Sequence, residues 1–339
     1  MATMQDIANL VGVSRGTVDR VLNEREGVNE ETRKKVKEAA EYLNYQLNKP
    51  SLVAKIRKMD IKIGVVLFDV SNPFFNEVLN GIYTKAEDMQ IYGCTLIVKQ
   101  IHFSVDEQLK AIDELTEEGI KGLILVPIAD NRIKIRIAWL HDHGIETVTL
   151  NSDISDSPRL AYVGSDTYKA GQTAGGLMGL IAQGETEVGI ITGSQYITGH
   201  EERVHGFLDI IRANYPNITM AALDECDNDD YKSYNIVQRM LSEHPTINAF
   251  YFTAGGVFGG CKALAQTMGS SKFKVITFDA PSTTLDYMNR GIISATICQE
   301  PRKQGFYALG IMMDHLIFNN EPEKRIKYTD IVIKIKESI

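Results

Sequence analysis

Polar side chains that suit carbohydrate recognition follow the predicted strands of this 339-residue chain. Planar amide, carboxylate and guanidinium groups bind neighbouring hydroxyls well, because each hydroxyl both donates and accepts a hydrogen bond. Aromatic rings add a surface on which the apolar face of a sugar ring stacks. The residues of these types near strand ends form the predicted ligand-binding set, which is Asn72, Phe74, Phe75, Asn151, Asp153, Arg203, Asp279 and Gln299.

Each of these residues also has a purely structural explanation. Phe74 and Phe75 open a helix, where aromatic side chains more often belong to a core. Arg203 has acidic neighbours in sequence that suit a surface ion pair, Asp279 is placed to cap a helix, and Gln299 suits an exposed strand end. We nevertheless predict one shared cleft, because polar groups follow five different strands.

From residue 61 onward, apolar runs typical of buried strands alternate with helical segments. The predicted strands lie at 61–69, 94–100, 122–127, 146–151, 187–193, 249–254, 274–280 and 294–299. The predicted helices lie at 74–90, 106–118, 168–183, 200–214, 231–242 and 302–318. Continuous apolar strands with helical crossovers predict parallel sheets that are covered on both faces.

The strand–turn–helix pattern begins twice, at Ile61 and at Glu187. We therefore expect two α/β lobes with a ligand between them, beyond the carboxyl ends of their strands. Residues 328–336 alternate with a period of two and predict one half-buried edge strand.

Residues 3–23 have the pattern of a compact helix-turn-helix, with two short apolar-faced helices broken at a glycine. Thr3 is placed to cap the first helix, with Asp6 completing a capping box, and Ser14 is placed to cap the second. This leaves the second helix facing outward with Arg15 near its start. Reading the major groove of DNA requires this arrangement.

Residues 29–45 predict a third helix, with Asn29 as its N-cap and two acidic residues in its first turn. Residues 49–59 are basic and apolar on one side, and Leu52 and Ile56 share a helical face there. This segment fits a solvated linker, and it fits equally a hinge helix that inserts an apolar side chain into the minor groove.

Composition and charge narrow the class of protein. The chain is 44% hydrophobic and 24% charged, without the ~20-residue apolar run that spans a bilayer. Residues 1–60 hold 11 Lys and Arg against 9 Asp and Glu, whereas residues 61–339 hold 25 against 35. The N-terminus lacks the basic and apolar segments of a secretion signal, and the four cysteines lie far apart. We therefore expect a cytoplasmic protein with reduced cysteines in its core.

Motifs of catalysis are absent from the sequence. It has no G-x-S-x-G, P-loop, H-E-x-x-H or G-x-G-x-x-G, and its seven histidines lack metal-ligand spacing. We therefore expect no enzymatic activity, no metal site and no cofactor. Trp139 falls on a helical apolar face and is expected in the core.

Several motifs resemble the LacI/GalR family of bacterial transcription regulators. MQDIANLVGVSRGTVDRVLN followed by GVNEETRKKVKEAAEYLNY is similar to the three-helix headpiece of that family. NPFF (72–75), HEERVHGF (200–207), FDA (278–280) and ATICQ (295–299) resemble the periplasmic sugar-binding fold, especially the ribose-binding type. The resemblance covers nearly the whole chain. It implies DNA contacts from Thr3, Met4, Ser14, Arg15, Gly16, Thr17, Arg20, Asn23, Asn29, Leu52 and Ile56.

Several positions depart from the family pattern. Gly16 gives up one base-reading side chain, and the hinge segment lacks the expected leucine in register. Asp19 stands where a small hydroxyl residue is usual, and a carboxylate beside phosphates is unfavourable unless it pairs with Arg15 or accepts from a cytosine amine. Residues 253–256, TAGG, replace the usual Asn-Asp, and Asn151-Ser152 replaces the usual Asp-Arg. The expected effector is therefore another monosaccharide or a polyol rather than ribose.

The resemblance implies an α-helical helix-turn-helix headpiece joined to an α/β, two-lobed, type I periplasmic-binding-protein-like domain with two parallel doubly wound sheets. The expected boundaries are 1–46 for the headpiece, 47–60 for the hinge and 61–339 for the effector-binding domain. Within that domain, the N-lobe is expected at 61–163 and 300–320 and the C-lobe at 164–298 and 324–337.

The implied function is sequence-specific regulation of transcription. A homodimer, expected to be a repressor, would bind near-palindromic operator DNA with an affinity that a small carbohydrate-like effector controls. The alternatives are a regulator of the same fold with a polyol or nucleobase effector, a sugar-binding transport protein, and an enzyme that acts on a small carbohydrate.

Overall fold

The apolar residues of the N-terminal stretch are buried between three helices, α1 (Met4–Val11), α2 (Arg15–Leu22) and α3 (Glu30–Tyr42). Between α1 and α2 the chain turns at Gly12, whose φ of 74° is a left-handed conformation that glycine adopts without strain. The predicted helix-turn-helix with a third helix is confirmed. Its core consists of Ile7, Ala8, Val18, Val21, Leu22, Val36, Ala39 and Ala40.

Local capping fixes where these helices begin. The Thr3 hydroxyl accepts the N–H of Asp6 at 3.3 Å, and the Asp6 carboxylate accepts the N–H of Thr3 at 2.7 Å. The Ser14 hydroxyl accepts the N–H of Thr17 at 3.1 Å, and Asn29 caps α3 in the same way. All three caps are therefore as the sequence predicts.

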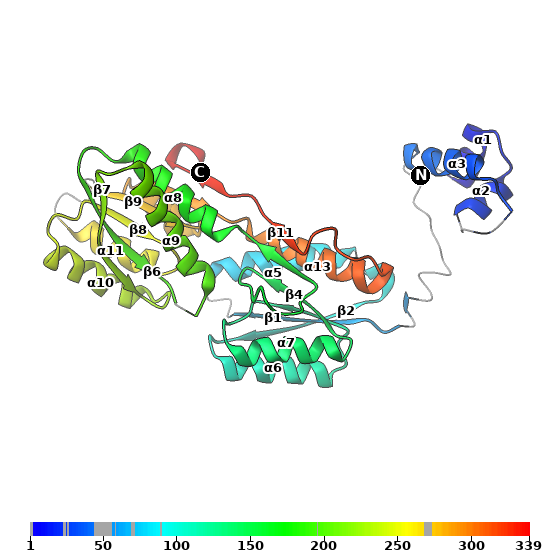
Figure 1. Ribbon diagram of the computed structural model, residues 1–339, viewed down its shortest axis with the longest axis horizontal. Coiled ribbons are helices and arrows are strands. Elements are labelled where there is room, and N and C mark those ends of the chain that lie inside the picture. Colours follow the sequence, from blue (N-terminus) through cyan, green and yellow to red (C-terminus); the bar gives the residue numbers. More distant parts are fainter. Residues whose placement is uncertain are drawn as a thin grey trace. The chain divides into compact units, whose positions relative to one another are not determined.

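The structure is a computed structural model. It describes residues 3–22, 25, 27–43, 56–57, 59–68, 72–88, 90–194, 196–267 and 273–339. The chain divides into two units, Met1–Met59 and Asp60–Ile339, and each is described here by itself (Figure 1). Asn23, Leu52 and most of the predicted hinge lie outside the described residues.

Apolar strands of the second unit form two six-stranded sheets, one in each lobe. The first sheet has the order β11-β5-β4-β3-β1-β2 and is parallel throughout. The second has the order β12-β10-β9-β8-β6-β7, with β12 alone antiparallel among the described pairs. The strands of the first sheet are β1 (Lys62–Phe68), β2 (Thr95–Ile101), β3 (Gly122–Leu125), β4 (Glu146–Leu150), β5 (Ala161–Gly164) and β11 (Ile326–Tyr328). The others are β6 (Thr186–Thr192), β7 (Ile218–Glu225), β8 (Ala249–Phe252), β9 (Lys274–Phe278), β10 (Ala295–Cys298) and β12 (Val332–Lys334).

Helices cover both faces of each sheet, as continuously apolar strands require. In the first lobe, one face carries α6 (Val105–Glu117) and α7 (Asn131–Asp142), and the other carries α5 (Pro73–Glu87) and α13 (Pro301–Phe318) (Figure 1). In the second lobe, one face carries α8 (Thr167–Ile181) and α9 (Thr198–Asn214), and the other carries α10 (Asp230–Glu243), α11 (Val257–Gln266) and α12 (Ser282–Asn289). Among the described residues, 3₁₀ turns lie at Gln90–Tyr92 and Lys336–Ser338. The predicted fold class of two doubly wound sheets is confirmed.

The tail differs from the prediction of one edge strand. Its first part, β11, pairs with β5 in the first sheet, whereas β12 pairs with β10 in the second. The assignment of residues 324–337 to the C-lobe is therefore wrong for β11. The reason is that period-two alternation marks a strand but carries no information about which sheet the strand joins.

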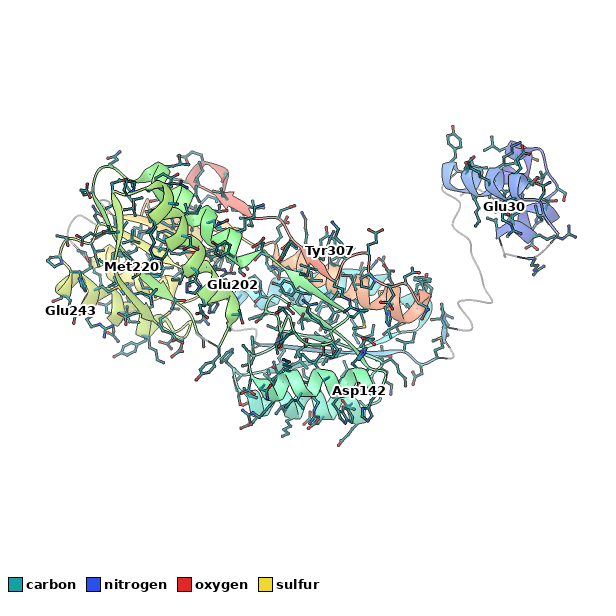
Figure 2. The ribbon with its side chains drawn as sticks, viewed as in Figure 1. Glu30, Asp142, Glu202, Met220, Glu243 and Tyr307 are labelled. Atoms are coloured by element: carbon teal, nitrogen blue, oxygen red, sulfur yellow. The ribbon has the colours of Figure 1, made fainter. Side chains whose placement is uncertain are left out.

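Two further strands are absent from the sequence prediction. The four residues of β5 are fully buried, but the run is too short to stand out from its surroundings. The edge strand β7 exposes side chains such as Met220 (Figure 2). It therefore lacks the continuous apolar run that identifies a central strand.

Trp139 is not a core residue, contrary to expectation. Its side chain is 41% exposed, and its indole stacks on the ring of His143 with centroids 3.8 Å apart. The buried stripe of α7 is formed by Ile133, Ile137 and Leu140, and Trp139 lies beside that stripe.

The four cysteines are free thiols, but they share no common environment. Cys226 and Cys261 are buried, as predicted, whereas Cys94 and Cys298 are half-buried. None of the described helices has both the length and the apolar character that crossing a membrane requires.

The chain crosses between the lobes from β5 to α8, from β10 to α13 and from β11 to β12. Hydrogen bonds join these three connections at Gln299. The Thr329 hydroxyl donates to the Gln299 carbonyl at 2.8 Å, and the Thr329 N–H donates to the Gly164 carbonyl at 2.8 Å. The Ser165 hydroxyl donates to the side-chain oxygen of Gln299 at 3.0 Å. A rotation of one lobe against the other therefore acts on this residue.

Candidate functional site

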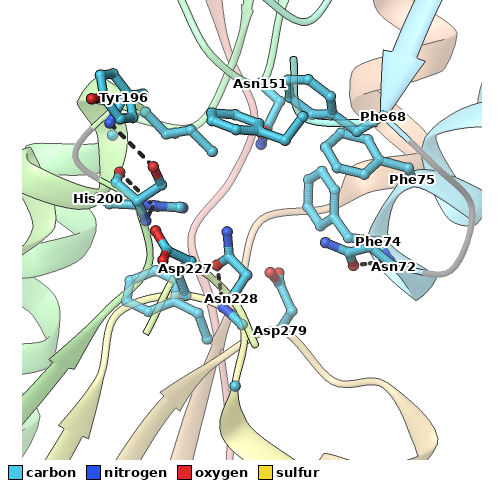
Figure 3. Close-up of a pocket in the computed structure, with 18 of the residues that line it drawn as sticks. Phe68, Asn72, Phe74, Phe75, Asn151, Tyr196, His200, Asp227, Asn228 and Asp279 are labelled. Atoms are coloured by element: carbon cyan, nitrogen blue, oxygen red, sulfur yellow. Dashed lines mark hydrogen bonds between the residues drawn. The ribbon is translucent and has the colours of Figure 1, made fainter. Parts of the chain in front are cut away.

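A cavity of about 890 Å³ lies between the two lobes, beyond the carboxyl ends of their strands (Figure 3). Ligands of open α/β sheets bind at this position. Most of the predicted ligand-binding residues line it, namely Asn72, Phe74, Phe75, Asn151, Arg203, Asp279 and Gln299.

The first lobe contributes an aromatic wall. The ring of Phe68, at the end of β1, lies 5.6 Å from that of Phe75 and 5.1 Å from that of Phe103. Phe74 packs edge-on against Phe75 with centroids 5.3 Å apart. These side chains offer ring faces and edges to an apolar part of a ligand.

Local sequence sets the position of this wall. Pro73 occupies the first turn of α5, where its missing N–H costs nothing. The Asn72 side-chain oxygen accepts the N–H of Phe74 at 3.0 Å and so caps the helix. That bond fixes the orientation of the amide, and its nitrogen points into the cavity (Figure 3). Asn72 is thus both a helix cap and a donor at the cavity wall.

The second lobe contributes a polar wall centred on Arg203, which is 5% exposed. Its Nη1 donates to the Thr253 carbonyl at 2.7 Å, and its Nη2 donates to the side-chain oxygen of Gln299. The guanidinium lies 4.0 Å from the ring centroid of Phe278. The Gln299 amide nitrogen in turn donates to both Asp279 oxygens, at 3.2 and 3.0 Å. Arg203, Gln299 and Asp279 therefore form one bonded chain.

Burial dominates the ionisation of this wall. It raises the pKa of the Asp279 carboxyl from 3.8 to about 6, against the opposing effects of Arg203 and the Gln299 hydrogen bonds. Burial likewise lowers the pKa of Arg203, against the nearby Asp279 carboxylate. It also lowers the pKa of His200 to about 3, with a further contribution from Arg203, so this imidazole is neutral.

Two buried polar atoms at this cavity have no hydrogen-bond partner among the described residues, the Nε of Arg203 and the Oγ1 of Thr284. A buried donor without a partner costs about 1–3 kcal/mol. Native proteins accordingly leave few such groups unless a ligand, an ion or water supplies the missing bond.

Backbone strain also concentrates at the cavity. Four of the described non-glycine residues with positive φ line it, with angles of 61° at Asn151, 53° at Asp227, 60° at Asn228 and 61° at Asp279. Left-handed backbone at non-glycine residues clusters at functional sites, where it aims a side chain.

The cavity has no spare positive charge for an anion. Arg132 and Arg203 are its two Lys or Arg side chains among the described residues. Arg132 pairs with Asp130 at 3.2 Å, and Asp279 offsets the charge of Arg203. In the part of the chain that the structure describes, no group of three or more His, Cys, Asp or Glu side chains is placed to hold a metal ion. The arrangement suits a neutral ligand with hydroxyls and an apolar face.

Comparison with known proteins assigns both parts of the chain. Residues 63–320 match the family described as periplasmic binding protein domain, and residues 3–48 match the bacterial regulatory proteins of the lacI family. The first match covers most of the chain, and the second covers the headpiece. The chain belongs to the LacI/GalR family.

Relatives of this LacI/GalR-family chain agree with both matches. The ribose operon repressor of Halalkalibacterium halodurans is 26% identical over 330 residues, covering 96% of this chain and 92% of the relative. The HTH-type transcriptional repressor PurR of Edwardsiella ictaluri is 25% identical over 336 residues, covering 96% and 94%. The structure of GanP, a glucose-galactose binding protein from Geobacillus stearothermophilus, matches with a TM-score of 0.77 and 27% identity, covering 82% of this chain and 98% of that one. The chain is thus a DNA-binding, ligand-responsive transcriptional repressor.

The LacI/GalR headpiece presents several of the predicted DNA-contacting residues together. Ser14, Arg15, Gly16 and Arg20 are exposed on or just before α2. Thr17 is half-buried, and its hydroxyl lies 2.9 Å from that of Ser14. These side chains share one helix and remain available to a partner.

Other predicted DNA-contacting residues have structural roles in the headpiece. Thr3 and Asn29 are exposed caps, and Met4 is half-buried against the core. Ile56 is 2% exposed, so this conformation does not offer its side chain to a minor groove. Asp19 binds Arg25 at 3.3 Å, a partner that the sequence interpretation does not include.

Asp153 is placed away from the cavity, contrary to prediction. Both of its oxygens accept from Arg159, at 2.5 Å each, and one also accepts from the Thr149 hydroxyl at 2.6 Å. These partners occupy the carboxylate, and Asp153 is not among the residues that line the cavity. The prediction that Asp153 faces the ligand is corrected accordingly.

Sequence reasoning misses several polar residues that line the cavity, and His200 and Asn228 are among them. His200 lies inside the HEERVHGF motif, but a lone histidine gives no signal of its orientation. Asn228 follows β7, the edge strand that the sequence pattern does not show. Recognising that strand would have added Asn228 to the residues at strand ends.

Proposed function

We propose that a small neutral sugar or polyol, bound in the cavity between the lobes, controls the affinity of this repressor for its operator. The observation that carries the proposal is the pairing of two walls from different lobes. Phe74 and Phe75 offer an apolar surface, while Asp279 and the donors around it offer bonds to hydroxyls. A sugar ring presents both kinds of surface at once.

Ligand binding favours a closed arrangement of the lobes, because the walls of both lobes contact the same ligand only when the lobes are close together. Gln299 lies at the junction of the three connections and also bonds Asp279. A ligand on Asp279 therefore acts on the point about which the lobes rotate. Coupling to operator binding is expected at about 1–3 kcal/mol, a change of roughly 5–150-fold in affinity.

The DNA-reading surface is proposed on α2. Arg15 and Arg20 supply guanidinium forks that suit guanine, and Gly16 leaves its position open to the groove. Thr3, Ser14, Thr17 and Asn23 are proposed to hold phosphates. Two copies of the chain would occupy the two halves of a near-palindromic site.

The test measures operator affinity by fluorescence anisotropy, using the full chain and a duplex recovered by selection from random DNA. Sugars and polyols are first screened by thermal shift, because a ligand that binds the folded state raises the melting temperature. We expect a stabilising sugar or polyol to change operator affinity by at least fivefold. Failure of every sugar and polyol to shift either quantity would overturn the proposal.

A further inference from the structure

The cavity contains a second polar subsite, formed by His200 and Asn228. A Cβ added at Gly193 would lie 2.5 Å from the imidazole of His200 and 2.6 Å from the side-chain oxygen of Asn228. The two side chains are therefore neighbours across a glycine, and both line the cavity. Figure 3 shows them on the same wall.

The backbone fixes the tautomer of His200. Its Nδ1 lies 2.9 Å from the Ser194 N–H, which can only donate, and 3.2 Å from the Ser194 carbonyl. That carbonyl already accepts the N–H of Ile197 at 3.1 Å, whereas the Ser194 N–H has its partner in the imidazole. Nδ1 is therefore the acceptor, and the proton of the neutral ring lies on Nε2. His200, which lines the cavity, therefore has an N–H donor at Nε2.

The orientation of Asn228 is fixed in the same manner. Its side-chain oxygen accepts the N–H of Gly255 at 3.0 Å, so its amide nitrogen is directed elsewhere. That nitrogen points into the cavity (Figure 3). The left-handed backbone at Asn228 holds it there, with a φ of 60°. Both side chains of the subsite therefore present donors, because their acceptor atoms are already occupied.

The surroundings restrict what these donors bind. Ala254, Gly256, Val257 and Phe258 also line the cavity, and in sequence they flank Gly255, which Asn228 contacts. Asp227 and Asp230 also line the cavity. Asp227 pairs with Lys232 at 2.6 Å, and Asp230 accepts the N–H of Gly259 at 3.0 Å. The two carboxylates disfavour an anion, and the apolar segment suits a methyl group or a ring edge.

We propose that the effector is a neutral sugar derivative with a carbonyl substituent, whose oxygen accepts from His200 Nε2–H and Asn228 Nδ2–H. An acetamido group fits this chemistry, because its carbonyl matches the donors and its methyl matches the apolar segment. A nucleoside offers the same carbonyl on a planar base. The inference deepens the proposed function and rests on it, since the sugar ring would occupy the aromatic and Asp279 walls.

The test compares matched sugars by calorimetry on the full chain. Glucose, galactose and mannose are each measured beside their 2-amino and 2-acetamido forms, and ribose is measured beside uridine. We expect at least one carbonyl-bearing member to bind tenfold or more tightly than its parent, as roughly one to two neutral hydrogen bonds provide. The cationic amino sugars separate a general effect of substitution from acceptance of the two hydrogen bonds.

Two variants test the named donors. Asn228→Asp keeps the oxygen that accepts from Gly255 but withdraws the N–H donor, and His200→Asn keeps an acceptor for Ser194 but withdraws the Nε2 donor. Each should reduce the preference for the carbonyl-bearing member to threefold or less. Asn214→Asp, the same chemical change at the exposed end of α9, should leave that preference intact.

The outcomes separate this inference from the function on which it rests. If a plain sugar binds and changes operator affinity while its carbonyl-bearing form binds no more tightly, the subsite assignment is wrong and the proposed function stands. Preference that survives both variants also overturns the assignment. If no sugar, polyol or nucleoside of the panel binds, both fail together. Preference for uridine over acetamido sugars supports the assignment with the carbonyl on a base.

Discussion

The residues proposed to read DNA and the residues that line the cavity are positioned in opposite ways. Arg15 and Arg20 lie on one eight-residue helix and remain exposed, so their partner is supplied from outside the chain. Arg203 and Gln299 stand 96 positions apart and are buried against each other. A substitution on α2 should therefore alter DNA binding alone, whereas a substitution in the cavity should alter both the response to ligand and the stability of the fold.

The largest effect is expected for Arg203→Ala, which removes the centre of the polar wall. Loss of two charge-assisted hydrogen bonds and of the cation over Phe278 should reduce effector affinity by at least 100-fold, about 3 kcal/mol or more. Isothermal calorimetry measures this loss of affinity, with a sugar or polyol that the thermal-shift screen identifies. Arg212→Ala, an exposed arginine on the same helix, is the matched control.

Unchanged effector affinity in Arg203→Ala would show that this side chain does not contribute to the effector site. The change also leaves Asp279 without its nearby cation, so thermal unfolding of the variant serves as the check of folding. Arg203→Lys separates charge from geometry, since an ammonium cannot reproduce the fork that meets Thr253 and Gln299.

The second prediction concerns Asp279 and the dependence of stability on pH. The carboxyl ionises near 3.8 when unfolded and near 6 when folded, so the folded state binds more protons between these values. Its contribution to the free energy of unfolding therefore falls as pH rises through this range, by about 2–3 kcal/mol. Asp279→Asn should remove that part of the pH dependence.

Urea denaturation from pH 4 to pH 7 measures this difference between parent and variant. His200 acts in the opposite sense, because its depressed pKa makes stability rise with pH from about 3 to 6.5. Subtracting the two curves isolates Asp279. The control is Asp286→Asn, an exposed carboxylate that pairs with Arg290. Identical slopes in the parent and in Asp279→Asn would contradict the assignment.

The third prediction tests the exposed region. Arg15→Ala should weaken operator binding by about 1–3 kcal/mol and relax the preference at one base position, with no change in effector affinity. Anisotropy titrations against the selected duplex and single-base variants measure both effects. Lys37→Ala removes an exposed positive charge from α3 and should act alike on all sequences. A parent-like base preference in Arg15→Ala would show that this side chain does not read the groove.

The smallest effect is expected for Thr3→Ala at the start of α1. Loss of the capping box should destabilise the headpiece by about 1 kcal/mol. Faster hydrogen exchange at the α1 amides of the full chain reports this change. Exchange at α9 is the internal reference, since the second unit does not depend on that cap. Equal acceleration in both helices would mean that the two units do not respond separately.

The sequence alone determines the elements whose signals are local. Capping by Thr3, Ser14 and Asn29 depends on neighbours three residues away, and the headpiece core follows from helical spacing. The aromatic wall is equally local, because Asn72 caps the helix that Phe74 and Phe75 open. The headpiece motifs and NPFF (72–75) lie in these same stretches.

The tertiary structure alone decides which distant residues meet. Gln299 looks like an exposed strand end in sequence, yet it joins Arg203, Asp279 and the three lobe connections. Asp153 looks like a ligand-facing residue, yet it pairs with Arg159 and does not line the cavity. Periodicity reports which face of an element is buried, but it carries no information about which other element covers that face. The donors of His200 and Asn228 are set by backbone groups that occupy their acceptor atoms. The spacing of residues in the sequence does not predict these contacts.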